Sequence, residues 1–235
     1  MATDIVSAFA TAFGLIVGLD PTFLAVVALS LKVTLSALVL AAVAGLPLGA
    51  LLGITRFPGR GATIVVVNTL MGLPPVVAGL VLYLLLSRSG PLGGFGLLFT
   101  PGAMIAAQTL LILPIVVALT RQTTEDLWGE YGEHLRSIGL TGARAVPTLL
   151  WDGRFALTTA LLAGFGRASA EVGAVLIVGG NIAGHTRTMT TTIALETSKG
   201  DLALALGLGI ALVGLTLAIN AVAFSAGRIA ARHVG

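Results

Sequence analysis

The sequence predicts an all-α integral membrane protein with about five transmembrane helices, and three observations lead to this fold class. Hydrophobic residues occupy 56% of the 235 positions, charged residues occupy only 10%, and the mean hydropathy is +1.03. A soluble fold of this length needs more polar surface than these residues supply. The apolar residues also gather in five stretches, each long enough to cross a hydrocarbon core about 30 Å thick.

The first twenty residues are expected to lie in the membrane interface rather than to cross it. The apolar stretch 5–18 is too short to span, and the first positive charge is Lys32, so the basic start of a cleaved signal peptide is missing. Ile5, Phe9 and Phe13 share one helical face. An interfacial helix over 1–20 therefore fits best.

The five spans are expected, in chain order, at residues 23–53, 63–86, 99–120, 155–180 and 202–224. Glycine and proline interrupt three of them, at 45–47, at 72–75 and at Pro114, which predicts kinked helices. Such breaks are common in membrane helices, and they also occur where irregular backbone lines a substrate pathway. The hydropathy pattern contains no duplication, so residues 1–235 are expected to form a single domain.

Positive charges alternate between the loops. The basic residues of the first loop, the third loop and the C-terminus are Arg56, Arg60, Arg121, Arg136, Arg144, Arg154, Arg228 and Arg232. The second and fourth loops hold only Arg88, Arg187 and Lys199. The positive-inside rule then places the C-terminus in the cytoplasm and the N-terminus outside, in a multi-pass protein of the cytoplasmic (inner) membrane. Because the basic residues are scattered singly, nucleic acid is not expected as a partner.

The third loop, residues 121–154, is the longest polar segment and is expected to form a cytoplasmic helical hairpin. Thr123 to Asp126 has the spacing of a helix N-terminal cap. A short amphipathic helix would follow, with its apolar face made by Trp128, Tyr131, Leu135 and Ile138. Gly139 would end that helix, and a second apolar segment runs from 143 to 151. The residues alone allow either a plain connector or a docking element.

Two charged residues lie inside the fourth span. Arg167 and Glu171 are four positions apart, so in a continuous helix both project from one face. A charge at the centre of a span costs roughly 2.5 to 3.5 kcal/mol, so the two should pair or face the protein interior. Three interpretations stay open: a structural ion pair, attraction of an oxyanion by the Arg167 guanidinium, and gating.

The fourth loop is rich in hydroxyl groups. Its candidates for a pathway or for an ordinary outer loop are Asn181, Thr188, Met189 and Thr190. Hydroxyls and backbone amides can donate hydrogen bonds to an oxyanion without holding it too tightly to leave. Threonine-rich turns are equally typical of outer loops, and the residues alone do not separate the two.

The sequence offers no chemistry of its own for catalysis or metal binding. It has no cysteine and no phosphate-binding Gly-x-x-x-x-Gly-Lys-Ser/Thr motif. His134, His185 and His233 are widely separated, without a His-Glu-x-x-His zinc motif or a Gly-x-Ser-x-Gly elbow. We therefore expect a chain that is not an enzyme and that binds no metal or cofactor.

Part of the third loop resembles a known coupling motif. Glu133-His134-Leu135, followed after three residues by Gly139, resembles the EAA loop of ABC importer permeases. The two alanines of that motif are His134 and Leu135 here, and its usual Leu-Pro end is Trp151-Asp152. The resemblance implies that this loop docks on an ATP-binding subunit and transmits its closure.

A second likeness covers most of the chain, from about residue 20 to 225. Glu171-Val172-Gly173 and the Gly-Gly-Asn-Ile, His-Thr-Arg-x-Met-Thr-Thr and Leu-Glu-Thr-Ser-Lys-Gly-Asp segments that follow resemble the tungstate permease family, relatives of the molybdate and sulfate permeases. Segments 30–34, 45–49 and 71–77 extend the likeness forward.

The resemblance implies the MetI-like fold of type I ABC importer permeases and a homodimer around one pathway. It also implies two further partners, an ABC ATPase subunit that binds ATP and Mg and an extracytoplasmic oxyanion-binding protein. The expected function is that of a permease subunit importing an oxyanion, tungstate first. A molybdate or sulfate permease of the same class and an ion-coupled secondary transporter remain the alternatives.

Overall fold

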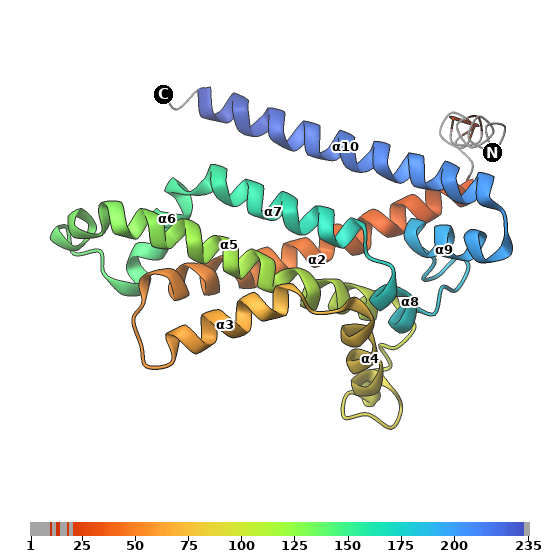
Figure 1. Cartoon of the computed structure of the whole chain (residues 1–235), viewed down its shortest axis with the longest axis horizontal. Coiled ribbons are helices and arrows are strands. Elements are labelled where there is room, and N and C mark those ends of the chain that lie inside the picture. The colour runs from red at the N-terminus through yellow and green to blue at the C-terminus, as the bar shows by residue number, and fades with distance from the viewer. Residues whose placement is uncertain (1–9, 11–12, 15–17, 19–20, 233–235) are drawn as a thin grey trace. The chain divides into compact units, whose positions relative to one another are not determined.

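The computed structural model describes residues 10, 13–14, 18 and 21–232, and those residues form helices and loops without a strand (Figure 1). The α-helices are α2 (Pro21–Ile54), α3 (Arg60–Met71), α4 (Pro75–Leu86), α5 (Pro101–Ser137), α6 (Val146–Asp152), α7 (Arg154–Ser169), α8 (Gly173–Gly179), α9 (Met189–Lys199) and α10 (Leu202–Arg232). Two short 3₁₀ turns are η1 (Gly93–Phe95) and η2 (Gly142–Ala145). The all-α fold class is confirmed, whereas the interfacial helix expected over 1–20 lies almost entirely outside the described residues.

Three helices, α2, α5 and α10, are long and apolar enough to cross a membrane unaided. The bent pairs α3 with α4 and α7 with α8 raise the number to five if each pair counts as one span. The first bend follows from local chemistry, because Gly72 closes α3 and Pro74 and Pro75 disfavour helical backbone before them. In contrast, α2 and α5 stay helical through Pro47 and Pro114.

The chain is organised as two compact units that each combine several segments. The first unit comprises 1–36, 74–108 and 169–226, and the second comprises 37–73, 109–168 and 227–235. Helices α2 and α5 each run from one unit into the other, so neither unit is a separate stretch of sequence. The two units are described in turn below.

A row of glycines holds α2 against α5 in the second unit. Gly45, Gly49 and Gly53 are spaced by four residues, which places them on one face of α2. A Cβ on Gly49 would lie 2.6 Å from the backbone oxygen of Val117, and one on Gly53 would lie 2.8 Å from that of Arg121. Small residues at this spacing let two membrane helices approach closely.

Arg60 ties the start of α3 to the end of α2 and to α5. Its Nε donates to the Leu52 carbonyl at 2.9 Å and its Nη2 to the Gly53 carbonyl at 3.3 Å, which satisfies open carbonyls at the end of α2. Nη2 also pairs with Glu125 Oε1 of α5 at 3.1 Å. No residue of α3, all of which the structure describes, is buried, so this anchor matters for its position.

The first unit is built on the contact of α4 with α8. A Cβ on Gly79 of α4 would lie 2.8 Å from the Ala174 Cα, so only glycine permits this approach. In the last turn of α8, the Val178 carbonyl accepts a hydrogen bond from the Phe99 amide at 2.9 Å. Phe99 also packs edge-on against Tyr83 of α4, with ring centroids 6.2 Å apart.

Candidate functional site

The polar end of α5 is a continuation of a membrane span. The separate amphipathic helix predicted to start with a cap at 123–126 is wrong, because α5 continues unbroken from Pro101 to Ser137. The Thr123 and Thr124 hydroxyls donate to the Leu119 and Thr120 carbonyls, one turn back, instead of capping a new helix. With 37 residues, α5 is about 55 Å long, so it extends well beyond a hydrocarbon core of about 30 Å.

Gly139 ends α5 as predicted, and a second short helix follows. Its φ of 83° lies in the left-handed region, and the Leu140 amide donates to the Leu135 carbonyl at 2.8 Å. This hydrogen bond from residue 140 to residue 135 is the six-to-one bond of a Schellman motif, in which Gly139 is the left-handed residue. The chain then passes through η2 into α6, so the predicted hairpin is confirmed in outline.

The hairpin is anchored by a hydrophobic cluster. The buried members come from α2, α5, η2 and α6, and they are Ala50, Ile54, Leu135, Ala145, Val146 and Leu149. Leu135 is 6% exposed, so this candidate contributes packing rather than a contact surface. The cluster fixes the hairpin to the ends of both α2 and α5.

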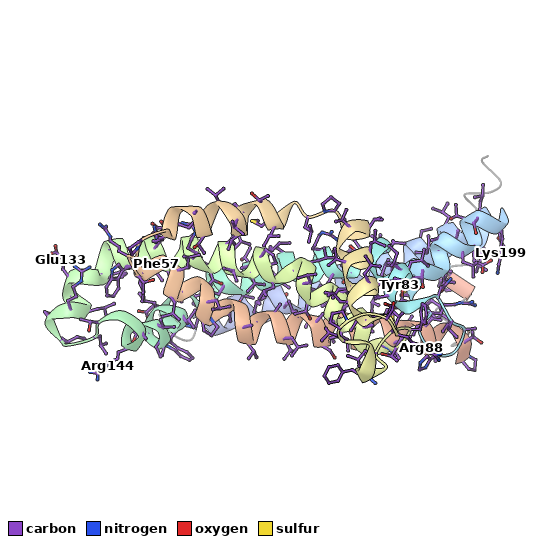
Figure 2. The ribbon with its side chains drawn as sticks, turned by 90° about the horizontal axis from the view of Figure 1, so that it is seen from below. Phe57, Tyr83, Arg88, Glu133, Arg144 and Lys199 are labelled. Atoms are coloured by element: carbon purple, nitrogen blue, oxygen red, sulfur yellow. The ribbon has the colours of Figure 1, made fainter. Side chains whose placement is uncertain are left out.

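Around Glu133 and His134, both exposed, the hairpin presents three large side chains to the outside. Tyr131, Ile138 and Trp151 are 45%, 59% and 69% exposed. We call these five residues the hairpin surface. Figure 2 shows Glu133 and Arg144 at the same end of the second unit. Exposed apolar groups rimmed by charge are typical of a protein-binding surface.

A pocket of about 630 Å³ opens beside Glu133. Its charged lining consists of Glu130, Glu133, Arg56 and Arg136, together with Trp128, over whose ring the Arg136 guanidinium stacks at 5.1 Å. Arg56 comes from the loop after α2 and was not a candidate in the sequence. Its only sequence signal was the cluster of basic residues in the first loop.

The pKa of the Tyr131 phenol is raised above its usual range, because it donates a hydrogen bond to the Glu130 carboxylate and lies near that negative charge. The phenol therefore stays protonated at neutral pH and remains a hydrogen-bond donor on the hairpin surface. Both residues lie in the polar extension of α5, beyond its apolar stretch.

Arg167 and Glu171 do not share one continuous helix, so the premise that they project from one helical face is wrong. Helix α7 ends at Ser169, two residues after Arg167, and α8 begins at Gly173. Glu171 lies in the break, 2% exposed, and its Oε1 accepts a hydrogen bond from the Ala174 amide at 2.9 Å. A carboxylate in this position satisfies an open amide at the start of α8. The roles of both residues in an anion pathway stay predictions.

The hydroxyl-rich stretch after α8 is partly helical and buried. Thr188 caps α9, and its Oγ1 accepts from the Thr191 amide while the Thr191 hydroxyl accepts from the Thr188 amide. Thr188, Met189 and Thr190 are 4%, 1% and 9% exposed, so this part of the stretch is packed within the protein, and the choice between a pathway and an outer loop stays a prediction. The Thr188 and Thr190 hydroxyls and the Thr188 and Met189 amides are engaged within the protein.

These residues meet Glu171 and α2 in one polar cluster. The Thr190 hydroxyl donates to the Glu171 backbone carbonyl at 2.8 Å, and the Met189 amide donates to the Ser30 hydroxyl at 2.8 Å. Ser30 belongs to segment 30–34, which resembles the permease family named above, but it was not predicted as a site residue. The cluster therefore links the start of α9, the break before α8 and the first half of α2.

Asn181 has a positive φ of 50° and shapes the turn after α8. Its Nδ2 donates to the Thr191 carbonyl at 3.5 Å, and its own carbonyl accepts from Arg187 Nη2 at 3.3 Å. Asparagine tolerates this backbone conformation better than most residues. Its contacts support a structural role, and a pathway role stays a prediction.

Replacing Thr188 by alanine is expected to weaken the start of α9 by about 1 kcal/mol, the usual worth of an N-terminal cap. Hydrogen exchange at the Thr191 amide should then accelerate about fivefold, because a donor loses its acceptor. Thr188→Ser keeps the hydroxyl, so its Thr191 amide should exchange at the same rate as in the parent. Equal exchange in the alanine variant and the parent would show that the cap does not stabilise α9.

The chain has relatives among known transport proteins. No family model matches it. It is 42% identical over 209 residues to a probable anion ABC transporter permease protein of Haloferax volcanii, which covers 86% of this chain and 90% of that protein. It is 39% identical over 221 residues to the tungstate uptake system permease protein TupB of Peptoclostridium acidaminophilum, and the match covers 94% of this chain and 97% of that protein. The molybdenum transport system permease protein ModB of Azotobacter vinelandii is 33% identical over 186 residues, covering 72% and 79%.

Proposed function

The chain belongs to the tungstate permease family of ABC transporters, and on that premise we propose that it is the membrane subunit of an ATP-driven tungstate importer. Its fold is that of a multi-pass, MetI-like permease. The relative named for tungstate matches nearly the whole chain at 39% identity, whereas the molybdenum permease matches less of it at 33%. Molybdate is therefore the second candidate substrate.

The hairpin surface is the site at which an ABC ATPase would dock. The observation that carries this proposal is the continuity of α5, which runs from an apolar span to the exposed carboxylate of Glu133 without a break. A partner that moves the hairpin moves a rigid helix, and the anchoring cluster carries the same displacement to α2. The exposed Ile138 and Trp151 supply apolar contact area and Glu133 supplies a charge.

The proposed cycle draws its energy from the partner, since the sequence has no phosphate-binding motif. ATP and Mg would bind to the ATPase, whose closure favours the outward-facing state of the permease. Only a ligand or partner with different affinity for the two states can shift such an equilibrium. An extracytoplasmic binding protein would then deliver the anion to a pathway formed by two copies of this chain.

The polar cluster around Glu171 supports a structural role near that pathway. Its carboxylate and backbone carbonyl are both engaged, so Glu171 holds α8 and α9 in place. Arg167 lies in the last turn of α7 and is the candidate for attracting the anion. The proposed orientation places the hairpin and the C-terminus in the cytoplasm and the N-terminus outside, as the positive-inside rule indicates.

The first test is ATP hydrolysis by proteoliposomes that contain this chain, its ATPase and its binding protein. We expect tungstate to stimulate hydrolysis more than molybdate and both more than sulfate. Glu133→Ala should lower the stimulation about tenfold or more, because a charged hydrogen bond contributes about 1.5 to 3 kcal/mol. Thermal unfolding of the chain should not change, since Glu133 is exposed.

Asp126→Ala is the matched control, because Asp126 is an exposed acid on α5 that does not line the pocket. If Glu133→Ala is stimulated as strongly as this control, the hairpin surface is not the coupling site. A stronger response to molybdate would reassign the substrate. Anion transport by the chain alone, driven by an ion gradient, would contradict the importer and support a secondary transporter.

A further inference from the structure

An apolar hollow of about 390 Å³ lies under α3, between that helix and the packed pair α2 and α5. Its lining includes Leu48, Leu52, Val67, Leu70, Leu113 and Pro114. The side chains of α3 do not fill it, since none of the residues of α3, which the structure describes in full, is buried. The helix is held instead at one end by Arg60.

The hollow is suited to hydrocarbon rather than to water or a polar ligand. Of the described residues that line it, only Thr55 and Thr63 have polar side chains. Both hydroxyls already donate to backbone carbonyls one turn back, those of Leu51 and Gly59. A cavity without free polar groups does not hold ordered water, but it accepts apolar molecules.

One end of the hollow reaches a basic loop. Thr55 and Phe57, which flank Arg56 in the sequence, line the hollow. Arg56 is exposed and makes no ion pair with another described residue, whereas Arg60 is committed to α2 and Glu125. A basic side chain beside an apolar cleft in a membrane protein suits the headgroup of an anionic lipid.

We propose that the hollow binds one acyl chain of an anionic phospholipid whose phosphate pairs with Arg56. The lipid would belong to the leaflet on the side of the hairpin surface, because Arg56 also lines the pocket beside Glu133. Bound in this way, the acyl chain would supply the packing that α3 lacks against α2 and α5. The hollow shares no lining residue with the polar cluster around Glu171 and does not depend on the transported anion.

The test measures lipid binding to the full-length chain in detergent by native mass spectrometry, with equal amounts of phosphatidylglycerol and phosphatidylcholine. We expect one tightly held lipid and an approximately fivefold preference for phosphatidylglycerol, the equivalent of about 1 kcal/mol for one arginine near anionic lipid. Val67→Phe fills the hollow and should reduce binding about tenfold, since it excludes about two methylenes of the tail. Arg56→Gln should retain the lipid but lose the preference.

Val66→Phe is the matched control, because Val66 is the neighbouring valine on α3, 56% exposed and outside the hollow. It should bind lipid as the parent does. If Val67→Phe does not fold, Leu70→Phe serves as the second filling variant. Equal binding in the filling variant and the control, or no preference in the parent, would overturn the proposal. Loss of a dimer in the filling variant with lipid binding unchanged would assign the hollow to a second copy of the chain.

Discussion

Gly53→Leu is expected to separate α2 from α5 and to lower the free energy of unfolding by about 3 kcal/mol, at the upper end of overpacking effects. A side chain at this position meets the Thr124 hydroxyl and the Arg121 backbone carbonyl, which lies 2.8 Å from the first added carbon. A backbone oxygen cannot move aside as a flexible side chain can. The same change displaces the Gly53 carbonyl that Arg60 binds, so α3 should loosen as well. Thermal unfolding in detergent, followed by circular dichroism, measures the loss.

Gly129→Ala is the control for this prediction and should raise the free energy of unfolding instead of lowering it. Gly129 lies within α5, and a Cβ there meets no other atom within 4 Å. Because alanine favours helix over glycine by roughly 1 kcal/mol, the variant should be slightly more stable than the parent. Equal stability of Gly53→Leu and the parent would show that the glycine row does not set the distance between the helices.

Gly139→Val is expected to abolish most of the coupling while leaving the chain folded. The φ of 83° at Gly139 strains any L side chain, by roughly 1 to 2 kcal/mol, and a β-branched one most of all. The Leu140 amide would leave the Leu135 carbonyl, and the hairpin would change direction relative to α5. Anion-stimulated ATP hydrolysis in the reconstituted importer should fall about tenfold, as expected when more than about 1.4 kcal/mol of docking energy is lost.

Asparagine at the same position separates backbone conformation from bulk. Gly139→Asn should keep most of the stimulated activity, because asparagine adopts left-handed backbone at a small cost. Each variant is checked by thermal unfolding, where the valine variant should lose roughly 1 to 2 kcal/mol of stability from its backbone strain and the asparagine variant less. If the valine and asparagine variants are stimulated equally, the closure at Gly139 is not needed for coupling.

The C-terminal part of α2 is common to three features of the second unit. Its glycine row faces α5, and Ala50 and Ile54 join the cluster that anchors the hairpin. Leu48 and Leu52 line the hollow under α3. In the proposed cycle, a displacement of the hairpin would therefore act on α2 directly, and through the hollow it would also change the contact with α3. This connection is the route by which the proposed cycle would carry movement from the hairpin surface into the membrane.

The sequence by itself determined the fold class and the end of α5, and its five expected spans match the described helices if each bent pair counts as one span. Apolar length and composition predict a membrane helix without knowledge of its neighbours, since lipid is the solvent for each span. The break at 72–75 and the turn at Gly139 were equally local, because proline and glycine restrict or free the backbone wherever they occur. The glycine row of α2 was not predicted, because its close approach to α5 depends on a helix far along the sequence.

Tertiary structure alone decided which polar groups meet. The cap expected at 123–126 failed because the Thr124 hydroxyl has a carbonyl one turn back within a packed helix, and a short motif does not reveal that competition. The same limit applies to Arg56 beside Glu133 and to Met189 on Ser30, which are far apart in the sequence. Sequence spacing predicts which side chains share a face only along one continuous helix. The helix breaks between Ser169 and Gly173, so the spacing of Arg167 and Glu171 did not predict their relative positions. Contacts between segments depend on how the helices pack, which no local pattern encodes.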